Sequence, residues 1–191
     1  MKVIKENVSN KLEINKSLFY TDLIKVYSKE EVIQNLSIIK DKYKDATHYC
    51  YAYIIDDIKK SSDDGEPGGT AGVPIMESLN NKDLNYILCV VTRYFGGIKL
   101  GAGGLVRAYR KSVNEAINNT KLLDLIDGYQ VVIRVNYDMQ KDLEYLIKDN
   151  YQKEYDLDVK YIINCDQDLK DLLLSKYKIE SITRIKLEKE R

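Results

Sequence analysis

The segment Tyr86–Phe95 is apolar on both faces when its side chains are taken in alternation. Such a segment is typical of a strand at the centre of a sheet, where both faces are covered. A glycine-rich loop follows it, and Leu105–Asn118 repeats apolar residues at helical spacing. This succession predicts a central strand, a tight loop and a covering helix, and therefore a mixed α and β domain.

The segments before this strand predict further elements of the same domain. Ser28 and Glu31 have the spacing of a capping box, in which the serine oxygen accepts the backbone N–H of Glu31. The predicted elements are strands within Leu12–Val26, a helix from Ser28 to about Lys44, a strand over Thr47–Ile55, a polar loop over Asp56–Gly69 and a short helix over Thr70–Leu79.

The pattern of elements starts again near Gly128 and predicts a second domain. Its order is βαββαβ, the order of a ferredoxin-like domain. We therefore expect an α+β protein with one domain over residues 1–125 and a ferredoxin-like domain over residues 126–191. The predicted elements are Tyr129–Tyr137, Met139–Asn150, two strands within Tyr151–Cys165, Asp168–Tyr177 and Glu180–Leu187.

Charge is segregated around the glycine loop. No Asp or Glu occurs from Leu84 to Asn114, although the chain as a whole has 30 acidic and 30 basic residues. With a net charge of zero, any contact with nucleic acid must come from a local basic patch. Backbone N–H groups at glycines and at a helix start can add to such a patch. The candidate binding residues are Arg93, Tyr94, Gly96, Gly97, Lys99, Gly101, Gly103, Gly104, Arg107, Arg110 and Lys111.

A purely structural role for the glycine loop is an equal alternative, in which the loop is a tight crossover and the cations are solvated. The spacing is that of neither a Walker A loop nor a dinucleotide fingerprint, since Val106 stands where the last glycine of GxGxxG belongs.

A second cluster combines Asp63, Asp64 and Glu66 with His48, the single histidine. The carboxylates can hold a divalent cation or act as a general base, but a solvated turn is the simpler interpretation. They can also pair with the basic loop. His48 belongs to a strand face that continues with Cys50, and no GxSxG motif accompanies it. If the protein is an enzyme, these four residues are the catalytic candidates, and we predict neither a cofactor nor a metal.

The three cysteines and the tyrosines of one strand have simpler interpretations. Cys50, Cys89 and Cys165 are far apart and form no CxxC pair, so we expect buried free thiols in a reducing cytoplasm. The first ten residues lack the apolar segment of a signal peptide, and no apolar run has the length of a membrane helix. A face formed by Tyr49, Tyr51 and Tyr53 can stack unpaired bases, but packing beneath a helix is favoured.

Four segments of the sequence resemble the conserved blocks of the YigZ/IMPACT family. They are Ala46–Tyr53 (ATHYCYAY), Ser62–Pro74 (SDDGEPGGTAGVP), Val91–Gly101 (VTRYFGGIKLG) and Gly103–Tyr109 (GGLVRAY). The resemblance covers roughly residues 17–118, and the second half is similar only in pattern and length. Gly68 departs from the family pattern, where many members carry serine.

This resemblance implies a fold and a field of function. The first domain should be like the second domain of small-subunit ribosomal protein five, and the second like the fifth domain of elongation factor G. Eukaryotic members of the family are linked to the control of translation initiation through partner proteins. The implied partner is therefore RNA, the ribosome or a translation-control protein.

Three functions are compatible with these observations. We favour a translation-associated protein that binds RNA or the ribosome, followed by a regulator that contacts only a protein partner, followed by a hydrolase-like enzyme. The steep salt dependence of phosphate contacts separates the first from the second. We expect a cytoplasmic monomer or weak dimer without a membrane partner.

Overall fold

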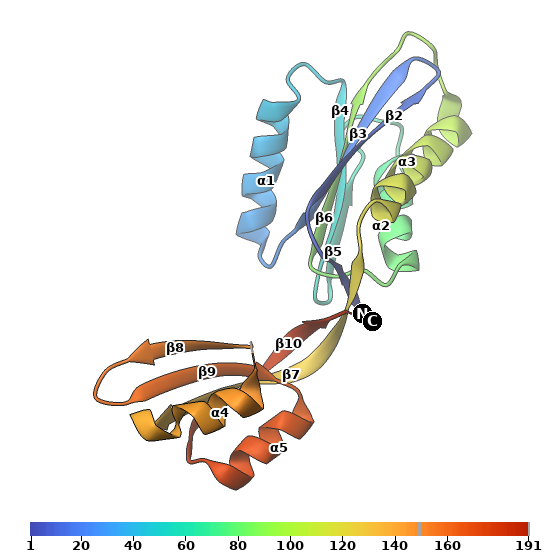
Figure 1. Cartoon of the computed structure of the whole chain (residues 1–191). Coiled ribbons are helices and arrows are strands. Elements are labelled where there is room, and N and C mark those ends of the chain that lie inside the picture. Colours follow the sequence, from blue (N-terminus) through green and yellow to red (C-terminus); the bar gives the residue numbers. More distant parts are fainter. Residues whose placement is uncertain (149, 191) are drawn as a thin grey trace. The chain divides into compact units, whose positions relative to one another are not determined.

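The computed structural model describes residues 1–148 and 150–190 (Figure 1). The chain forms two compact units, one of residues 1–124 with Glu190 and one of residues 125–189. Both units combine sheets and helices, so the mixed α+β class predicted from the sequence is confirmed. No helix among the described residues is long and apolar enough to cross a membrane.

The first unit contains a five-stranded antiparallel sheet in the order β2-β3-β6-β4-β5. Strand β6 lies at its centre and is buried along almost its whole length, as the apolar faces predicted. The bounds are β2 Val8–Ile14, β3 Ser17–Lys25, β4 His48–Ile55, β5 Ile58–Ser62 and β6 Ile87–Tyr94.

Helices cover both faces of this sheet, α1 on one side and α2 with α3 on the other (Figure 1). The bounds are α1 Lys29–Lys42, α2 Gly72–Asn81 and α3 Gly101–Asn118. Ser28 caps α1 by accepting the backbone N–H of Glu31 at 3.1 Å, as the capping box predicted.

Two helix starts differ from the prediction. Helix α3 begins at Gly101 and not at Leu105, so three of the loop glycines form its first turn. Helix α2 begins at Gly72, and Thr70 is not its N-cap. The Thr70 hydroxyl instead donates to the Pro67 carbonyl at 2.6 Å.

The face beneath α1 contains the tyrosines of β4. Tyr53 is buried, and Tyr49 and Tyr51 are partly buried in the same apolar cluster as Val32 and Ile39 of α1. The three tyrosines therefore pack beneath a helix, the arrangement that the sequence favoured over stacking of unpaired bases. All three cysteines are buried free thiols, as predicted.

The second unit has the predicted element order βαββαβ and the strand order β10-β7-β9-β8. Strand β7 starts earlier than expected, at Leu122, and its first three residues still belong to the first unit, where they pair with β1, Lys2–Ile4. The division at residue 125 therefore falls within a strand and not within a loop. The bounds are β7 Leu122–Val135, α4 Gln140–Ile147, β8 Tyr151–Tyr155, β9 Val159–Cys165, α5 Gln167–Lys176 and β10 Ile179–Lys189, with a 3-10 turn over Tyr137–Met139.

Candidate functional site

The motif residues of the first unit meet on the sheet face that α2 and α3 cover. Strands β4 and β6 pair so that His48 lies opposite Arg93, and Arg93 lies opposite Phe19 of β3. The loop from Asp63 to Thr70 leads from β5 to α2 and brings Glu66 to the same place. Segments that are far apart in the sequence, such as Ser17 and Arg93 at a separation of 76 residues, are thereby joined in one hydrogen-bonded cluster.

Glu66 and Arg93 form a buried ion pair at the centre of this cluster. Arg93 Nη1 donates to Glu66 Oε1 at 2.6 Å, and the two side chains are 5% and 3% exposed. Arg93 Nη2 also donates to Ser17 Oγ at 3.3 Å. The prediction that Arg93 belongs to an exposed basic surface is therefore wrong, because its position on β6 points it toward α3. The suggested pairing of the acidic loop with a cation does occur here.

Tyr109 of α3 and Cys50 of β4 complete the buried polar cluster. The Tyr109 hydroxyl donates to Glu66 Oε1 at 2.8 Å, and Cys50 Sγ lies 3.2 Å from that hydroxyl and 2.9 Å from the Asp63 carbonyl. Burial, followed by the nearby negative charge of Glu66, raises the pKa of Cys50 to about 12 despite the bond to Tyr109. The Cys50 thiol therefore stays protonated at neutral pH and is not a thiolate nucleophile.

His48 is oriented by a backbone carbonyl. Its Nδ1 lies 2.8 Å from the Asp64 carbonyl oxygen, which only accepts, so Nδ1 carries the proton. Its Nε2 faces Glu66 Oε2 at 3.8 Å, beyond hydrogen-bond range. His48 thus lies beside the ion pair without a direct hydrogen bond to it.

The three candidate carboxylates point to different partners. Asp63 accepts backbone N–H groups of the loop and of the α2 start, at 2.8–2.9 Å, whereas Asp64 accepts the Tyr49 N–H at 2.6 Å. Glu66 binds Arg93. Within residues 1–148 and 150–190, no group of three or more His, Cys, Asp or Glu side chains is arranged to hold a metal ion.

Asp63 therefore stabilises the start of α2, in the place that Thr70 was expected to take. Burial by itself would raise the pKa of Asp63, but the three backbone hydrogen bonds outweigh it, so the pKa is lowered. These bonds come from Gly69, Gly72 and Ala71.

This pKa predicts a pH-dependent contribution to stability. A carboxyl whose pKa is lowered by folding stabilises the protein above its unfolded pKa of about 4, and this contribution is lost as pH falls through the folded pKa. At pH 7, Asp63→Asn should lower the free energy of unfolding by about 2 kcal/mol. Urea unfolding from pH 7 down to pH 3 should show the two proteins converging in stability. A difference that stays constant over this range would contradict the role of the charge.

The glycine loop has a special backbone and an uncapped helix start. Gly97 and Gly101 have φ angles of +83° and +69°, which favour glycine. Leu100 occupies the N-cap position of α3 without a side-chain hydrogen bond. The first turn of α3 contains no acidic side chain to neutralise the positive end of the helix dipole.

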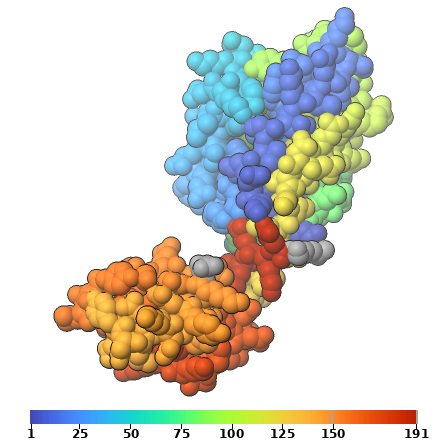
Figure 2. Space-filling model, viewed as in Figure 1, coloured from blue at the N-terminus to red at the C-terminus, as the bar shows by residue number. Residues whose placement is uncertain are grey.

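The exposed cations near this helix start fall into two groups. Arg110 pairs with Glu77, and Lys111 lies 3.8 Å from Glu115. Lys99 and Arg107 are exposed, and among the described residues neither has an ion-pair partner. The outer side of α3, yellow-green to yellow in Figure 2, lies on the surface of the first unit. Arg107, Arg110 and Lys111 are exposed and line one pocket along this helix. The basic surface thus contains fewer available cations than the sequence predicted, because Arg93 is buried and Arg110 and Lys111 have acidic partners.

A pocket of about 320 Å³ lies where the buried cluster meets the glycine loop. Glu66 and Arg93 lie on its wall together with Phe95, whose side chain is 46% exposed. The remaining lining residues are Pro67, Lys99, Leu100, Gly101, Ala102 and Leu105.

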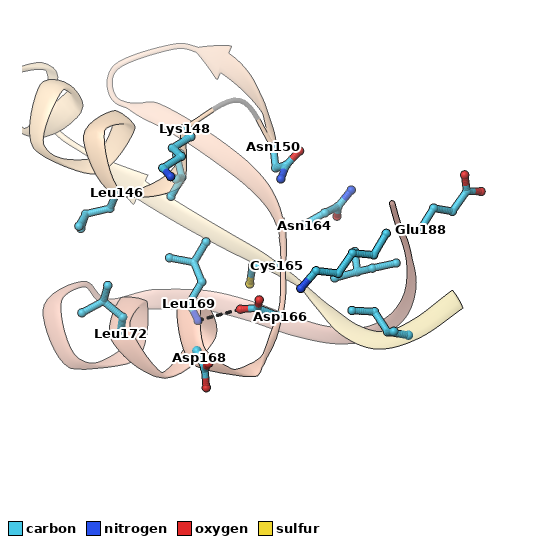
Figure 3. Close-up of a pocket in the computed structure, with 14 residues that line it drawn as sticks. Leu146, Lys148, Asn150, Asn164, Cys165, Asp166, Asp168, Leu169, Leu172 and Glu188 are labelled. Atoms are coloured by element: carbon cyan, nitrogen blue, oxygen red, sulfur yellow. Dashed lines mark hydrogen bonds between the residues drawn. The ribbon is translucent and has the colours of Figure 1, made fainter. Parts of the chain in front are cut away.

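A larger cavity, of about 650 Å³, lies in the second unit between α4, α5 and the end of β10 (Figure 3). Its charged side chains are of both signs, such as Lys148 and Asp168, and Asp166 is engaged in capping α5 through the Leu169 N–H. Burial, together with Asp166, raises the pKa of Cys165 to about 11, so this thiol is protonated too. Among the described residues, its lining contains no buried ion pair like that of Glu66 and Arg93.

The sequence alone does not reveal the central place of Glu66, or that Ser17, Tyr109 and Phe95 surround it. Tyr109 follows the apolar helical spacing of Leu105–Asn118, and this spacing gives no sign that its hydroxyl has a polar partner. Glu66, Arg93 and His48 all lie in the segments that resemble the family, and this was a signal that they share a site. Which of these side chains meet depends on the register of the strands.

Comparison with known proteins places these residues within a recognised domain. Residues 15–117 match the family described as the Impact N-terminal domain. The chain is 48% identical to the IMPACT family member YvyE of Bacillus subtilis over 124 residues, which are 63% of this chain and 57% of that protein. It is 42% identical to the IMPACT family member YigZ of Escherichia coli over 110 residues, 55% of this chain and 54% of that protein. The matches thus span little more than half the length of these relatives.

Two further relatives extend this comparison. An IMPACT family member from Thermus thermophilus is 39% identical over 124 residues, which are 65% of this chain and 68% of that protein. The crystal structure of a hypothetical protein superposes with a TM-score of 0.64 at 28% identity, and it covers 99% of this chain and 98% of that one. The fold of the whole chain is therefore found in an experimental structure.

Proposed function

This chain belongs to the IMPACT family, and we propose that it contacts RNA, free or within the ribosome, through a basic surface at the start of α3. The surface comprises Lys99, the first turn of α3 and Arg107 on the next turn. Its translation-associated role is what the family resemblance implies, and its chemistry follows from the residues.

One observation carries this proposal: the uncapped start of α3 is flanked by Lys99 and Arg107, which have no ion-pair partner among the described residues. The guanidinium of Arg107 reaches back along the helix, since Nη1 lies 3.5 Å from the place of a Cβ on Gly103. Backbone N–H groups, a helix dipole and two free cations are a favourable setting for phosphate groups. The paired cations Arg110 and Lys111 contribute less to such binding.

Exposed apolar side chains beside these cations favour unpaired RNA over a duplex. Phe95 and Ile98 are 46% and 43% exposed in the same loop. Aromatic side chains next to cations bind single strands, because every base offers a face for stacking.

The salt dependence of binding tests this surface. Removing two phosphate contacts by Lys99→Ala with Arg107→Ala should weaken binding of single-stranded RNA or ribosomal subunits. It should also flatten the slope of log K against log salt by about 1.4, since each contact contributes about 0.7. Fluorescence anisotropy between 50 and 300 mM salt, on the order of physiological ionic strength, measures both quantities.

A charge-matched control is Lys29→Ala with Lys82→Ala, which removes two exposed lysines elsewhere in the first unit. It should leave the slope unchanged. If both double variants bind alike, the surface at α3 is only solvated, and a regulator that contacts a protein partner becomes the better explanation.

A further inference from the structure

The pocket beside the buried ion pair has the features of a ligand site. Its volume of about 320 Å³ lies within the range of small-molecule sites. Such sites combine apolar walls with a few fixed polar groups, and here Phe95, Leu100 and Leu105 supply the walls. Glu66 and Arg93, both more than nine-tenths buried, supply the fixed polar groups.

Each of these two buried side chains retains unused hydrogen-bonding capacity. Arg93 Nε is buried and has no hydrogen-bond partner in the described part of the chain. Glu66 uses Oε1 for both Arg93 and Tyr109, while its Oε2 accepts no hydrogen bond from the described residues and has only His48 Nε2 at 3.8 Å. Buried polar atoms are normally satisfied, so the unpaired Arg93 Nε points to a missing partner, and Glu66 Oε2 is a free acceptor on a residue of the same pocket lining.

The ligand must match this donor and this acceptor at once. It needs an edge that donates to a carboxylate and accepts from a guanidinium, which a fully ionised anion such as sulfate does not have. A nucleobase has such an edge. Guanine fits best, because its N1–H and N2–H are adjacent donors and its O6 is an acceptor beside them. Uracil fits worst, because its carbonyl oxygens on both sides of N3–H would face the carboxylate.

The other groups of the pocket fit the rest of a nucleotide. Phe95 lines the pocket, and the Arg93 guanidinium carbon lies 5.6 Å from the centre of its ring, which holds the ring in place for stacking. Lys99 and the first residues of α3, Gly101 and Ala102, also line the pocket and can receive a phosphate.

We propose that this pocket binds one unpaired guanine nucleotide, with the base on Phe95, its donor edge at Glu66 and its phosphate at Lys99. The proposal rests on the proposed function, since it identifies the RNA nucleotide that enters the pocket when the basic surface binds RNA. Both a free guanine mononucleotide and a guanine in single-stranded RNA have this chemistry.

Titration of the full chain with the four nucleoside monophosphates tests the base. Calorimetry or ligand-observed NMR should show GMP binding about tenfold more tightly than UMP, the size of one good base contact. Phe95→Ala should weaken GMP binding by about tenfold, as loss of a stacking partner does. Ile58→Ala, which shortens a similarly exposed apolar side chain outside the pocket lining, should leave it unchanged.

Two further variants separate the parts of the ligand. Lys99→Ala should weaken GMP binding but not guanosine binding, because guanosine lacks the phosphate. Glu66→Gln should reduce the preference for GMP over UMP, with a thermal melt to establish that the variant is folded. If Glu66→Gln does not fold, Phe95→Ala tests the pocket in its place, because Phe95 is exposed and its substitution should not unfold the protein. Equal affinity for all four nucleotides, or GMP binding that Phe95→Ala leaves intact, would overturn the proposal.

RNA oligonucleotides distinguish the source of the ligand and the two proposals. A hexamer of uridines with one central guanine should bind more tightly than a hexamer of uridines only, if the guanine comes from RNA; GMP binding without this difference assigns the pocket to the free nucleotide. If RNA binds with the expected salt slope but neither GMP nor the guanine matters, the pocket proposal fails and the basic surface stands. If GMP binds as expected but Lys99→Ala with Arg107→Ala leaves RNA binding unchanged, the pocket stands and the surface fails.

Discussion

Glu66→Ala should lower the free energy of unfolding by about 3–5 kcal/mol, because it leaves the buried Arg93 without its counter-charge. Removing one partner of a buried ion pair costs far more than the pair itself contributes, since the remaining charge has lost its hydration and gains nothing in return. Tyr109 loses its hydrogen-bond acceptor in the same variant. Urea unfolding at pH 7, followed by circular dichroism, measures the change.

An exposed ion pair of the same unit is the matched control. Glu77 pairs with Arg110, and their side chains are 49% and 45% exposed. Glu77→Ala should therefore change stability by less than about 1 kcal/mol. Replacing both buried partners, by Glu66→Leu with Arg93→Met, should cost less than Glu66→Ala alone, because no buried charge remains. Equal losses for Glu66→Ala and Glu77→Ala would show that water reaches the Glu66–Arg93 pair.

The main elements of the fold could be predicted because their signals are local. Apolar residues on both faces of Tyr86–Phe95 identified the central strand β6, and the box from Ser28 to Glu31 identified the start of α1. The βαββαβ order after Gly128 was also visible in short-range periodicity. These signals depend on neighbouring residues only, so one sequence suffices to find them.

The start of α3 could not be predicted in the same way. Glycine disfavours a helix interior by about 1 kcal/mol relative to alanine, so Gly101–Gly104 resembled a loop. In the structure Gly101 has a positive φ angle, and a Cβ on Gly104 would lie 3.1 Å from Leu100 Cβ. Close contacts of this kind favour glycine at the helix start, but helix propensities do not include them.

The candidate site was half predicted. The sequence identified His48 and Glu66 as catalytic candidates and Arg93 as a binding candidate. The register of β4 and β6 then brings His48 and Arg93 together. Because β6 is apolar on both faces, its pattern does not tell which face α3 covers. Arg93 was therefore assigned to the surface, although it shares its face with the buried Cys89 and Val91. Only the pairing of distant strands resolves such an ambiguity.

The contact between Gly96 and the β2–β3 turn is a second long-range feature, and it gives the last prediction. Asn15 and Lys16 form this turn with φ angles of 47° and 64°, which suit a two-residue hairpin. A Cβ on Gly96 would lie 2.0 Å from the carbonyl carbon of Lys16 and 2.4 Å from the nitrogen of Ser17. Backbone atoms cannot rotate away as a side chain does, so the turn or the loop must move.

Gly96→Ala should therefore lower the free energy of unfolding by about 3 kcal/mol, the upper range for overpacking. Part of this loss should come from the hydrogen bond that the Gly96 N–H donates to Ser17 Oγ at 3.2 Å. Gly68→Ala is the control, because a Cβ there meets nothing within 4 Å and should change stability by no more than about 0.5 kcal/mol. Equal urea unfolding curves for the two variants would mean that the turn does not press on Gly96. A selective loss for Gly96→Ala would establish that the loop glycine is required by the turn 80 residues before it, independently of any ligand.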